Sequence, residues 1–166
     1  MQVFPVAGEA SFVDSYGEPR SNGRRHEGID IFAAQGTPVV AVDDGKVTFG
    51  ASELGGTIAH LRTTEAVYYY AHLASTLGVD RVVRAGEPIG AVGRTGNASG
   101  TAPHLHFEER FFSGEPTNPF PELREARTGP TLPPSSPSSP SSPKRPTTAP
   151  SGLGLLLLIY LVSRRT

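Results

Sequence analysis

The stretch Pro38-Val-Val-Ala-Val42, Asp43-Asp-Gly45, Lys46-Val-Thr-Phe49 places two β-rich segments on either side of a turn. Valine, threonine and phenylalanine are favoured in strands, and Asp-Gly between two such runs is a strong turn signal. The pattern predicts strands over 38–42 and 46–49 that are joined as a hairpin.

Further β-rich segments recur at short intervals along the chain. They lie at 57–62, 66–71, 88–92 and 105–112. No window of twelve residues between glycines shows the 3.6-residue period of an amphipathic helix. Nineteen glycines and sixteen prolines also favour turns and short strands. The predicted fold class is all-β, a mostly antiparallel two-sheet sandwich or distorted barrel with few or no long helices.

The composition changes after residue 128. Residues 129–150 contain eight prolines and six serines, which predicts a disordered linker after a globular domain at 1–128. Residues 151–166 form a short apolar tail with Arg164 and Arg165 near its end. The ten-residue run 153–162 would span about 15 Å as a helix, against a hydrocarbon core of about 30 Å. Two interpretations stay open: a C-terminal membrane anchor, or a tail without function.

Charge and cysteine content exclude several classes of function. The chain has no cysteine, so it has neither disulfides nor thiolate metal sites. Residues 1–128 hold 16 acidic and 11 basic residues. An acidic body does not favour contact with phosphate backbones, and we therefore expect no nucleic-acid partner.

Four of the five histidines fall in motifs with even spacing or lie between such motifs. His26 and Asp30 are four residues apart, His104 and His106 flank one leucine, and His72 lies between the two motifs in the sequence. On a strand, residues i and i+2 or i and i+4 share a face. Imidazole and carboxylate are the ligands of zinc sites in which water takes the fourth position. The pattern indicates a zinc site in which three of these side chains suffice.

The remaining motifs favour structural interpretations. His60 has no partner motif and is interpreted as a surface histidine. The glycine-rich segment 90–103 lacks a Gly-Lys-Ser/Thr end and is expected to be a tight loop before His104. Glu108 and Glu109 are adjacent, so on a strand they face opposite ways and cannot act together on one glycosidic bond. Glu108 is a candidate for orienting a neighbouring histidine.

At these residues the chain resembles the lysostaphin/LytM-type zinc metallopeptidases, a family of peptidoglycan endopeptidases with the duplicated hybrid motif domain. The similarity covers most of residues 5–120 in the order that the family shows. The matching stretches are His26-Glu-Gly-Ile-Asp30, Gly36-Thr-Pro-Val-Val-Ala41 with Gly45-Lys-Val47, Tyr70-Ala-His-Leu73, Gly86-Glu-Pro-Ile-Gly90, and Gly93-Arg-Thr-Gly-Asn97 leading to His104-Leu-His-Phe-Glu108. The extra residues Thr101-Ala-Pro103 before His104 depart from many relatives and leave the groove loops and the choice of substrate open.

The resemblance implies a groove over the sheet and a role for each histidine in it. It implies that His26, Asp30 and His106 bind Zn²⁺, and that His104 and His72 are catalytic. His104 or His72 would act as general base toward a metal-activated water, and a protonated histidine, His72 by preference, would stabilise the developing negative charge. The implied substrate is a stem peptide or cross-bridge of peptidoglycan.

Three alternatives stay open beside this hypothesis. Two histidines and one carboxylate also form the site of non-heme Fe(II) oxygenases. A second alternative is a non-catalytic module of the same fold that binds the cell wall or regulates other hydrolases. The third is a structural zinc site with His104 as a fourth ligand.

The substrate also sets expectations for location. We expect a monomer that acts outside the cytoplasm, in the periplasm or cell envelope. Met1-Gln-Val-Phe-Pro-Val has no signal-peptide pattern. The expectation is therefore an upstream leader or an enzyme delivered by a host, with the apolar tail as a candidate for membrane anchoring.

Overall fold

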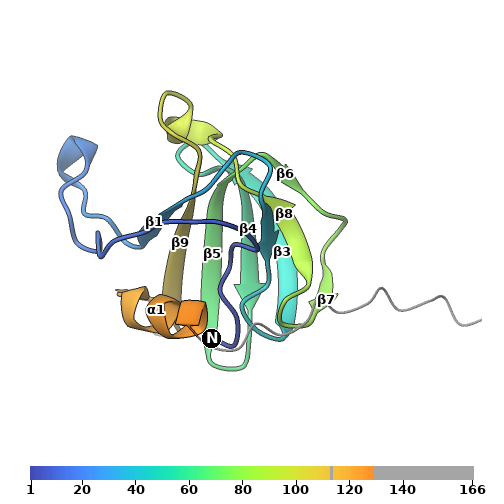
Figure 1. The fold of residues 1–166 in the computed structure, drawn as a ribbon. Helices are drawn as coiled ribbons and strands as arrows, with labels where there is room; N and C mark the ends of the chain where they lie inside the picture. Colours follow the sequence, from blue (N-terminus) through green and yellow to red (C-terminus); the bar gives the residue numbers. More distant parts are fainter. Residues whose placement is uncertain (113, 129–166) are drawn as a thin grey trace, which may run out of the picture. The chain divides into compact units, whose positions relative to one another are not determined.

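Two antiparallel sheets dominate the structure, a computed structural model that describes residues 1–112 and 114–128 (Figure 1). The larger sheet has the strand order β1-β9-β5-β4-β3-β7, and β10 also pairs with β9. Its strands are β1 (Ile29–Phe32), β3 (Gly45–Ser52), β4 (Gly56–Arg62), β5 (Ala66–Leu73), β7 (Arg81–Val83), β9 (His104–Phe111) and β10 (Pro116–Thr117). The smaller sheet has the order β2-β8-β6, with β2 (Pro38–Val40), β6 (Ser75–Thr76) and β8 (Pro88–Ala91). The predicted all-β, mostly antiparallel fold class is confirmed.

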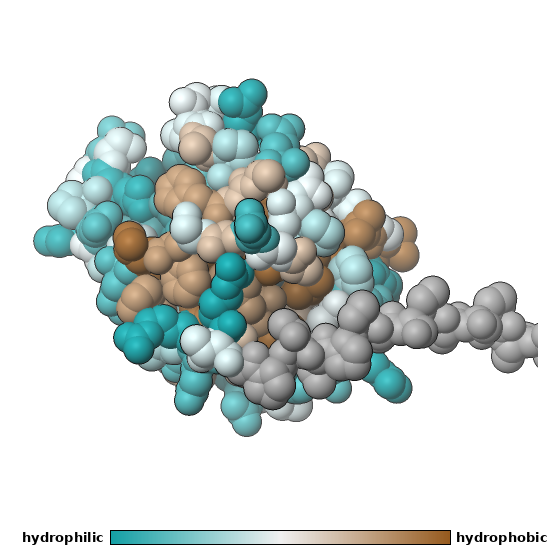
Figure 2. Space-filling view, in the orientation of Figure 1, coloured by the Kyte–Doolittle hydropathy of each residue, from teal (hydrophilic) through white to brown (hydrophobic). Residues whose placement is uncertain are grey.

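In the part of the chain that the structure describes, three short helices connect or cover the strands. They are the 3₁₀ turns η1 (Ser21–Gly23) and η2 (Gly96–Ala98) and the helix α1 (Phe120–Thr128). In Figure 1, the loop with η2 and the helix α1 lie at opposite ends of β9. The α1 residue Leu123 is completely buried and joins the core. Figure 2 shows hydrophilic residues gathered over the segment that carries η1.

The predicted hairpin over 38–49 is wrong, although both of its strands form. β2 pairs with β8 in the smaller sheet, and β3 pairs with β4 and β7 in the larger one. The backbone N–H groups after β2 form hydrogen bonds outside the predicted hairpin. Ala41 N–H donates to Glu87 O at 2.9 Å, and Val42 N–H donates to the Tyr70 hydroxyl at 3.0 Å. The Asp-Gly turn therefore carries the chain from one sheet to the other, through the buried Ala41 and Val42.

One face of the larger sheet packs into the core. Ile29 and Ile31 on β1, and Leu105 and Phe107 on β9, are completely buried. Burial of each such side chain contributes about 1.5–3 kcal/mol. A shift of one residue in either strand would expose all of its core residues, so this burial fixes the register. The alternate residues of both strands, among them Asp30, must then lie on the opposite face.

Two predicted segments lie beyond the part of the chain that the structure describes. They are the linker at 129–150 and the apolar tail at 151–166 with its proposed membrane association. Within residues 1–112 and 114–128, no helix combines the length and apolar character that crossing a membrane requires.

Candidate metal centre

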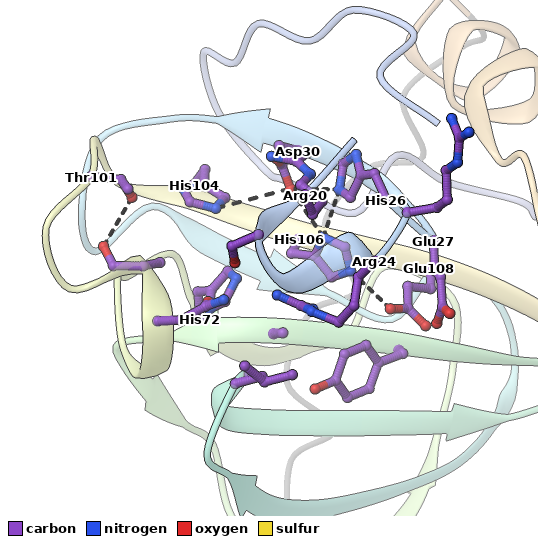
Figure 3. A pocket seen from close by; sticks show the side chains of 18 of the residues that line it. Arg20, Arg24, His26, Glu27, Asp30, His72, Thr101, His104, His106 and Glu108 are labelled. Carbon is purple, nitrogen blue, oxygen red and sulfur yellow. Dashed lines mark hydrogen bonds and ion pairs between the residues drawn. The ribbon is translucent and has the colours of Figure 1, made fainter. Parts of the chain in front are cut away.

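Three side chains converge on one point, two from adjacent strands and one from the segment that precedes the first of these strands. Asp30 on β1 lies opposite His106 on β9, and His26 comes from the segment that leads into β1. His26 Nε2 lies 3.1 Å from Asp30 Oδ1 and 3.0 Å from His106 Nδ1, and the last two atoms are 3.0 Å apart. Figure 3 shows the three side chains pointing toward one another. The structure thus brings together the three residues predicted as metal ligands.

A glycine allows the two strands to approach at this point. A Cβ atom on Gly28 would lie 2.2 Å from the carbonyl oxygen of Phe107, far inside van der Waals contact. Gly28 lies between His26 and Asp30, so its missing side chain lets their segment lie against β9. The even spacing of His26 and Asp30 predicted a shared strand face, but β1 begins only at Ile29, and His26 reaches the site from the preceding loop.

Outer hydrogen bonds fix the orientation of both imidazole rings. His26 donates from Nδ1 to Ser15 O at 2.8 Å, and His106 donates from Nε2 to Glu108 Oε1 at 2.9 Å. A carbonyl or a carboxylate oxygen can only accept, so the other nitrogen of each neutral ring carries a lone pair. Two nitrogen lone pairs and one carboxylate oxygen of Asp30 therefore face one another, which requires a positive charge between them.

The pKa values of Asp30 and His106 also indicate that a positive charge is needed between the three side chains. Burial raises the pKa of Asp30, but hydrogen bonds with His106 and His26 outweigh it and hold the pKa far below its usual range. Burial lowers the pKa of His106, but hydrogen bonds to Asp30 and Glu108 outweigh it and raise the pKa to about 9. Without a metal, a proton on His106 supplies the positive charge. A metal ion would take the place of that proton.

The donor atoms fit a tetrahedral metal ion with three protein ligands. Zinc accepts imidazole nitrogen and carboxylate oxygen at about 2.0–2.2 Å, so tetrahedral ligand atoms lie about 3.3–3.5 Å apart. The observed separations of 3.0–3.1 Å are within a few tenths of an ångström of this value. The three side chains line an open pocket, which leaves room for a fourth, non-protein ligand.

The two histidines predicted as catalytic lie beside this cluster. His104 shares a face of β9 with His106, and its Nε2 lies 3.9 Å from Asp30 Oδ1. The ring centroids of His72 and His104 are 4.9 Å apart. His104 donates from Nδ1 to Ala102 O at 2.8 Å, and His72 donates from Nδ1 to Thr95 O at 2.9 Å. Each ring therefore keeps a lone pair on Nε2.

An unusual backbone conformation turns His72 into the pocket. Ala71 is paired with His106, so a regular strand would direct His72 to the other face. Instead, His72 has a φ of 63°, and the pairing of β4 with β5 shifts between Thr57 and Ala59. A positive φ is costly for a residue with a side chain and is typical of functional sites. Burial, together with the nearby His104 and His106, lowers the pKa of His72 to about 4.

The pocket around these residues has a volume of about 520 Å³. Its walls include Phe32 and Leu54, which are 42 % and 48 % exposed, and three arginines that sequence reasoning missed: Arg20, Arg24 and Arg25. Arg20 donates from Nη2 to Asp30 Oδ2 at 2.7 Å. Nothing in the sequence pattern singled out these arginines, because they lie on the loop around η1.

The structure also shows the positions of the adjacent glutamates and of the fifth histidine. Glu108 and Glu109 do face opposite ways: Glu108 contacts His106, whereas Glu109 accepts a hydrogen bond from Thr117 Oγ1 at 3.2 Å. His60 does not line the pocket and is half-buried against Tyr69, with ring centroids 5.0 Å apart. Tyr69, which the sequence reasoning did not select, lines the pocket.

Comparison with known proteins agrees with this site. The family description Peptidase family M23 matches residues 24–119, a range that includes the three predicted metal ligands together with His72 and His104. The chain belongs to peptidase family M23. Its relatives include the DD-carboxypeptidase/endopeptidase Mpg of Neisseria meningitidis, which is 44% identical over 111 residues, 62% of this chain and 25% of that protein. The L-Ala–D-Glu endopeptidase of Bacillus subtilis is 35% identical over 135 residues, 72% of this chain and 41% of that protein.

The solved structure of a peptidase domain has the same fold. The catalytic domain of lysostaphin from Staphylococcus simulans matches with a TM-score of 0.62 and 34% identity, covering 69% of this chain and 92% of that domain. The resemblance inferred from the sequence motifs is confirmed. The chain spans about a quarter of the length of the Neisseria protein.

Proposed function

We propose that this M23 chain is a zinc-dependent endopeptidase that cleaves peptide bonds in peptidoglycan. The observation that carries the proposal is the convergence of His26 Nε2, Asp30 Oδ1 and His106 Nδ1 at 3.0–3.1 Å on the wall of a pocket. Relatives that are named as endopeptidases support the reaction class. Those three residues would hold the zinc ion. When bound, zinc supplies Lewis acidity and lowers the pKa of its water to about 7.

The other two histidines provide proton transfer. The lone pair of His104 Nε2 lies beside Asp30, within reach of a group held by the three ligands. It accepts the proton of the attacking water and can return it to the leaving amine. The hydrogen bond from Nδ1 to Ala102 O holds the ring in the tautomer that this role needs.

His72 lines the same pocket from β5, the strand that pairs with β9. Its pKa of about 4 keeps the ring neutral at pH 7 before the reaction begins. The family resemblance assigns a protonated histidine to the developing negative charge. With this pKa, His72 takes up a proton from solvent only as the negative charge develops beside it.

A peptidoglycan substrate places the activity outside the cytoplasm. Relatives that carry names such as lysostaphin and glycyl-glycine endopeptidase ALE-1 support a cell-wall substrate. We assign the activity to residues 1–128, which contain both the M23 match and the pocket.

The test is digestion of purified peptidoglycan by the full chain, with mass spectrometry of the new peptide ends. We expect cleavage that a chelator abolishes and that added zinc restores. His106→Ala should lose both zinc and cleavage, whereas His104→Ala should keep zinc and lose cleavage. His60→Gln, which changes the fifth histidine, should keep both.

The same assay separates the alternatives. A non-catalytic wall-binding module would bind peptidoglycan without releasing new ends. A non-heme iron site would contain iron after purification in air, and added zinc would not restore activity. Full cleavage by His104→Ala would refute the assigned role of this residue.

A further inference from the structure

In the described part of the chain, the carboxylates that line the pocket have guanidinium partners, whereas two of the arginines that line it have no carboxylate partner. The carboxylates that line it are Glu27, Asp30 and Glu108. Each has a guanidinium partner: Asp30 pairs with Arg20 at 2.7 Å, and Glu108 pairs with Arg110 Nη2 at 2.7 Å. Glu27 also pairs with Arg110. Each of these carboxylates is therefore in contact with a guanidinium, and Arg110 is shared by two of them.

Two arginines on the same wall have no anionic partner among residues 1–112 and 114–128. Arg25 donates from Nη1 to the neutral carbonyl of Gly17 at 3.0 Å, and the Arg24 guanidinium makes neither a hydrogen bond nor an ion pair there. Figure 3 shows the side chain of Arg24 reaching across the pocket in front of His106. Two guanidinium groups thus line the pocket without an ion-pair partner among the described residues.

The loop that carries these arginines is anchored at both ends. Arg20 N–H bonds to Arg24 O at 2.9 Å, and Pro19 forms a β-bridge with Arg25. His26 N–H also bonds to Glu18 O at 2.9 Å. His26 is one of the three candidate metal ligands. These contacts therefore hold Arg24 at a fixed position relative to the metal site.

The surroundings select a short anionic peptide as the occupant. A guanidinium forms bidentate, charge-assisted hydrogen bonds with carboxylates. The partly exposed Phe32 and Leu54 offer apolar contact for a peptide beside the arginines. A long polyanion does not fit, because residues 1–128 hold 16 acidic against 11 basic residues and would repel it outside the pocket.

We propose that Arg24, assisted by the charge of Arg25, binds a free carboxylate that the substrate carries close to the scissile bond. This inference rests on the proposed function and narrows its substrate class. The chain would prefer acidic peptides to uncharged glycine bridges. Among its relatives, one is named for an L-Ala–D-Glu bond and another for a glycyl-glycine bond. The two arginines favour a substrate with a carboxylate, like the L-Ala–D-Glu bond of the first relative.

The test uses pairs of fluorescent peptides that differ only by Glu or Gln beside an Ala, with both the L and D forms of each, and a Gly-Gly peptide. The full wild-type chain should cleave a Glu peptide about tenfold more efficiently than its Gln partner, the factor expected from one charge-assisted hydrogen bond. Arg24→Gln should remove this preference by slowing cleavage of the Glu peptide alone. Arg24→Lys should restore part of it. The control Arg84→Gln, at an exposed arginine outside the pocket, should leave it unchanged.

A binding measurement separates this inference from the proposed function. Fluorescence anisotropy with the chelator-treated full chain reports binding of the same peptides without hydrolysis. If no peptide is cleaved, but a preference for Glu in binding disappears in Arg24→Gln, the inference stands and the endopeptidase proposal fails. Equal cleavage of Glu and Gln peptides, a preference that survives in Arg24→Gln, or no preference in either measurement would overturn the inference.

Discussion

His106 donates a hydrogen bond from Nε2 to Glu108 Oε1 at 2.9 Å, between two residues that share one face of β9. Arg110, on the same face, holds the other oxygen of Glu108 through Nε at 2.9 Å and Nη2 at 2.7 Å. Glu108 is thereby fixed from both sides. Its contact with His106 leaves Nδ1 as the nitrogen that faces Asp30.

We expect Glu108→Ala to weaken zinc binding by about 10- to 100-fold, because the outer partner of a metal-binding histidine fixes its tautomer and ring orientation. Competition with a zinc-binding dye measures this affinity. Glu65→Ala, at an exposed glutamate, is the matched control. Wild-type affinity in Glu108→Ala would show that the hydrogen bond plays no part in metal binding.

Thr95 supports the strained backbone of His72. Its Oγ1 donates to Leu73 O at 3.0 Å and accepts from Thr57 N–H at 2.9 Å. Thr95→Val keeps the shape but loses both bonds, so His72 should shift and kcat/KM should fall about 10- to 100-fold. Zinc content should not change, and Thr95→Ser should recover most of the rate. A loss of zinc in Thr95→Val would instead indicate a role in the metal cluster.

Gly28 sets the separation of β1 and β9. Gly28→Ala places a methyl group against Phe107 O, and we expect a loss of about 1–3 kcal/mol in the free energy of unfolding. Urea unfolding of the metal-free protein measures this loss. Gly100→Ala, where a Cβ meets nothing within 4 Å, is the control and should cost far less. Equal stability of the two variants would contradict the close approach.

Glu109 makes stability depend on pH in a direction that can be tested. Burial and the nearby Glu122 raise the pKa of Glu109 above its usual value of 4.5. The folded state then binds more protons than the unfolded state, so this residue costs stability as the pH rises above 4.5. Glu109→Gln should raise Tm at pH 8, and the gain should shrink toward pH 4. No such trend is expected for the exposed Glu65→Gln. A lower Tm of Glu109→Gln at pH 8 would contradict the assignment.

The strand faces that build the site could be predicted from the sequence, because the spacing is local. Leu105 and Phe107 alternate with His104 and His106, and burial of the apolar pair fixes the direction of the histidines. The pairing of β1 with β9 then brings Asp30 opposite His106.

Features that depend on distant partners could not be predicted in this way. The Asp-Gly turn at 44–45 signals a change of direction, but it does not say which strand each arm joins. In the structure, β2 and β3 belong to different sheets, which the turn alone does not predict. His72 reaches the pocket through a φ of 63° that a strand pattern does not contain. Arg24 lies on a loop, and no strand or helix pattern in the sequence predicts that this loop forms part of the pocket wall.

The proposed site holds a single zinc ion between three side chains, with one position left for water. A crystal structure of the zinc-loaded full chain, with anomalous data at the zinc edge, tests this most directly. We expect one zinc ion bonded to His26 Nε2, Asp30 Oδ1, His106 Nδ1 and a water. A fourth bond from His104 Nε2 in place of the water, or zinc bound elsewhere, would contradict it.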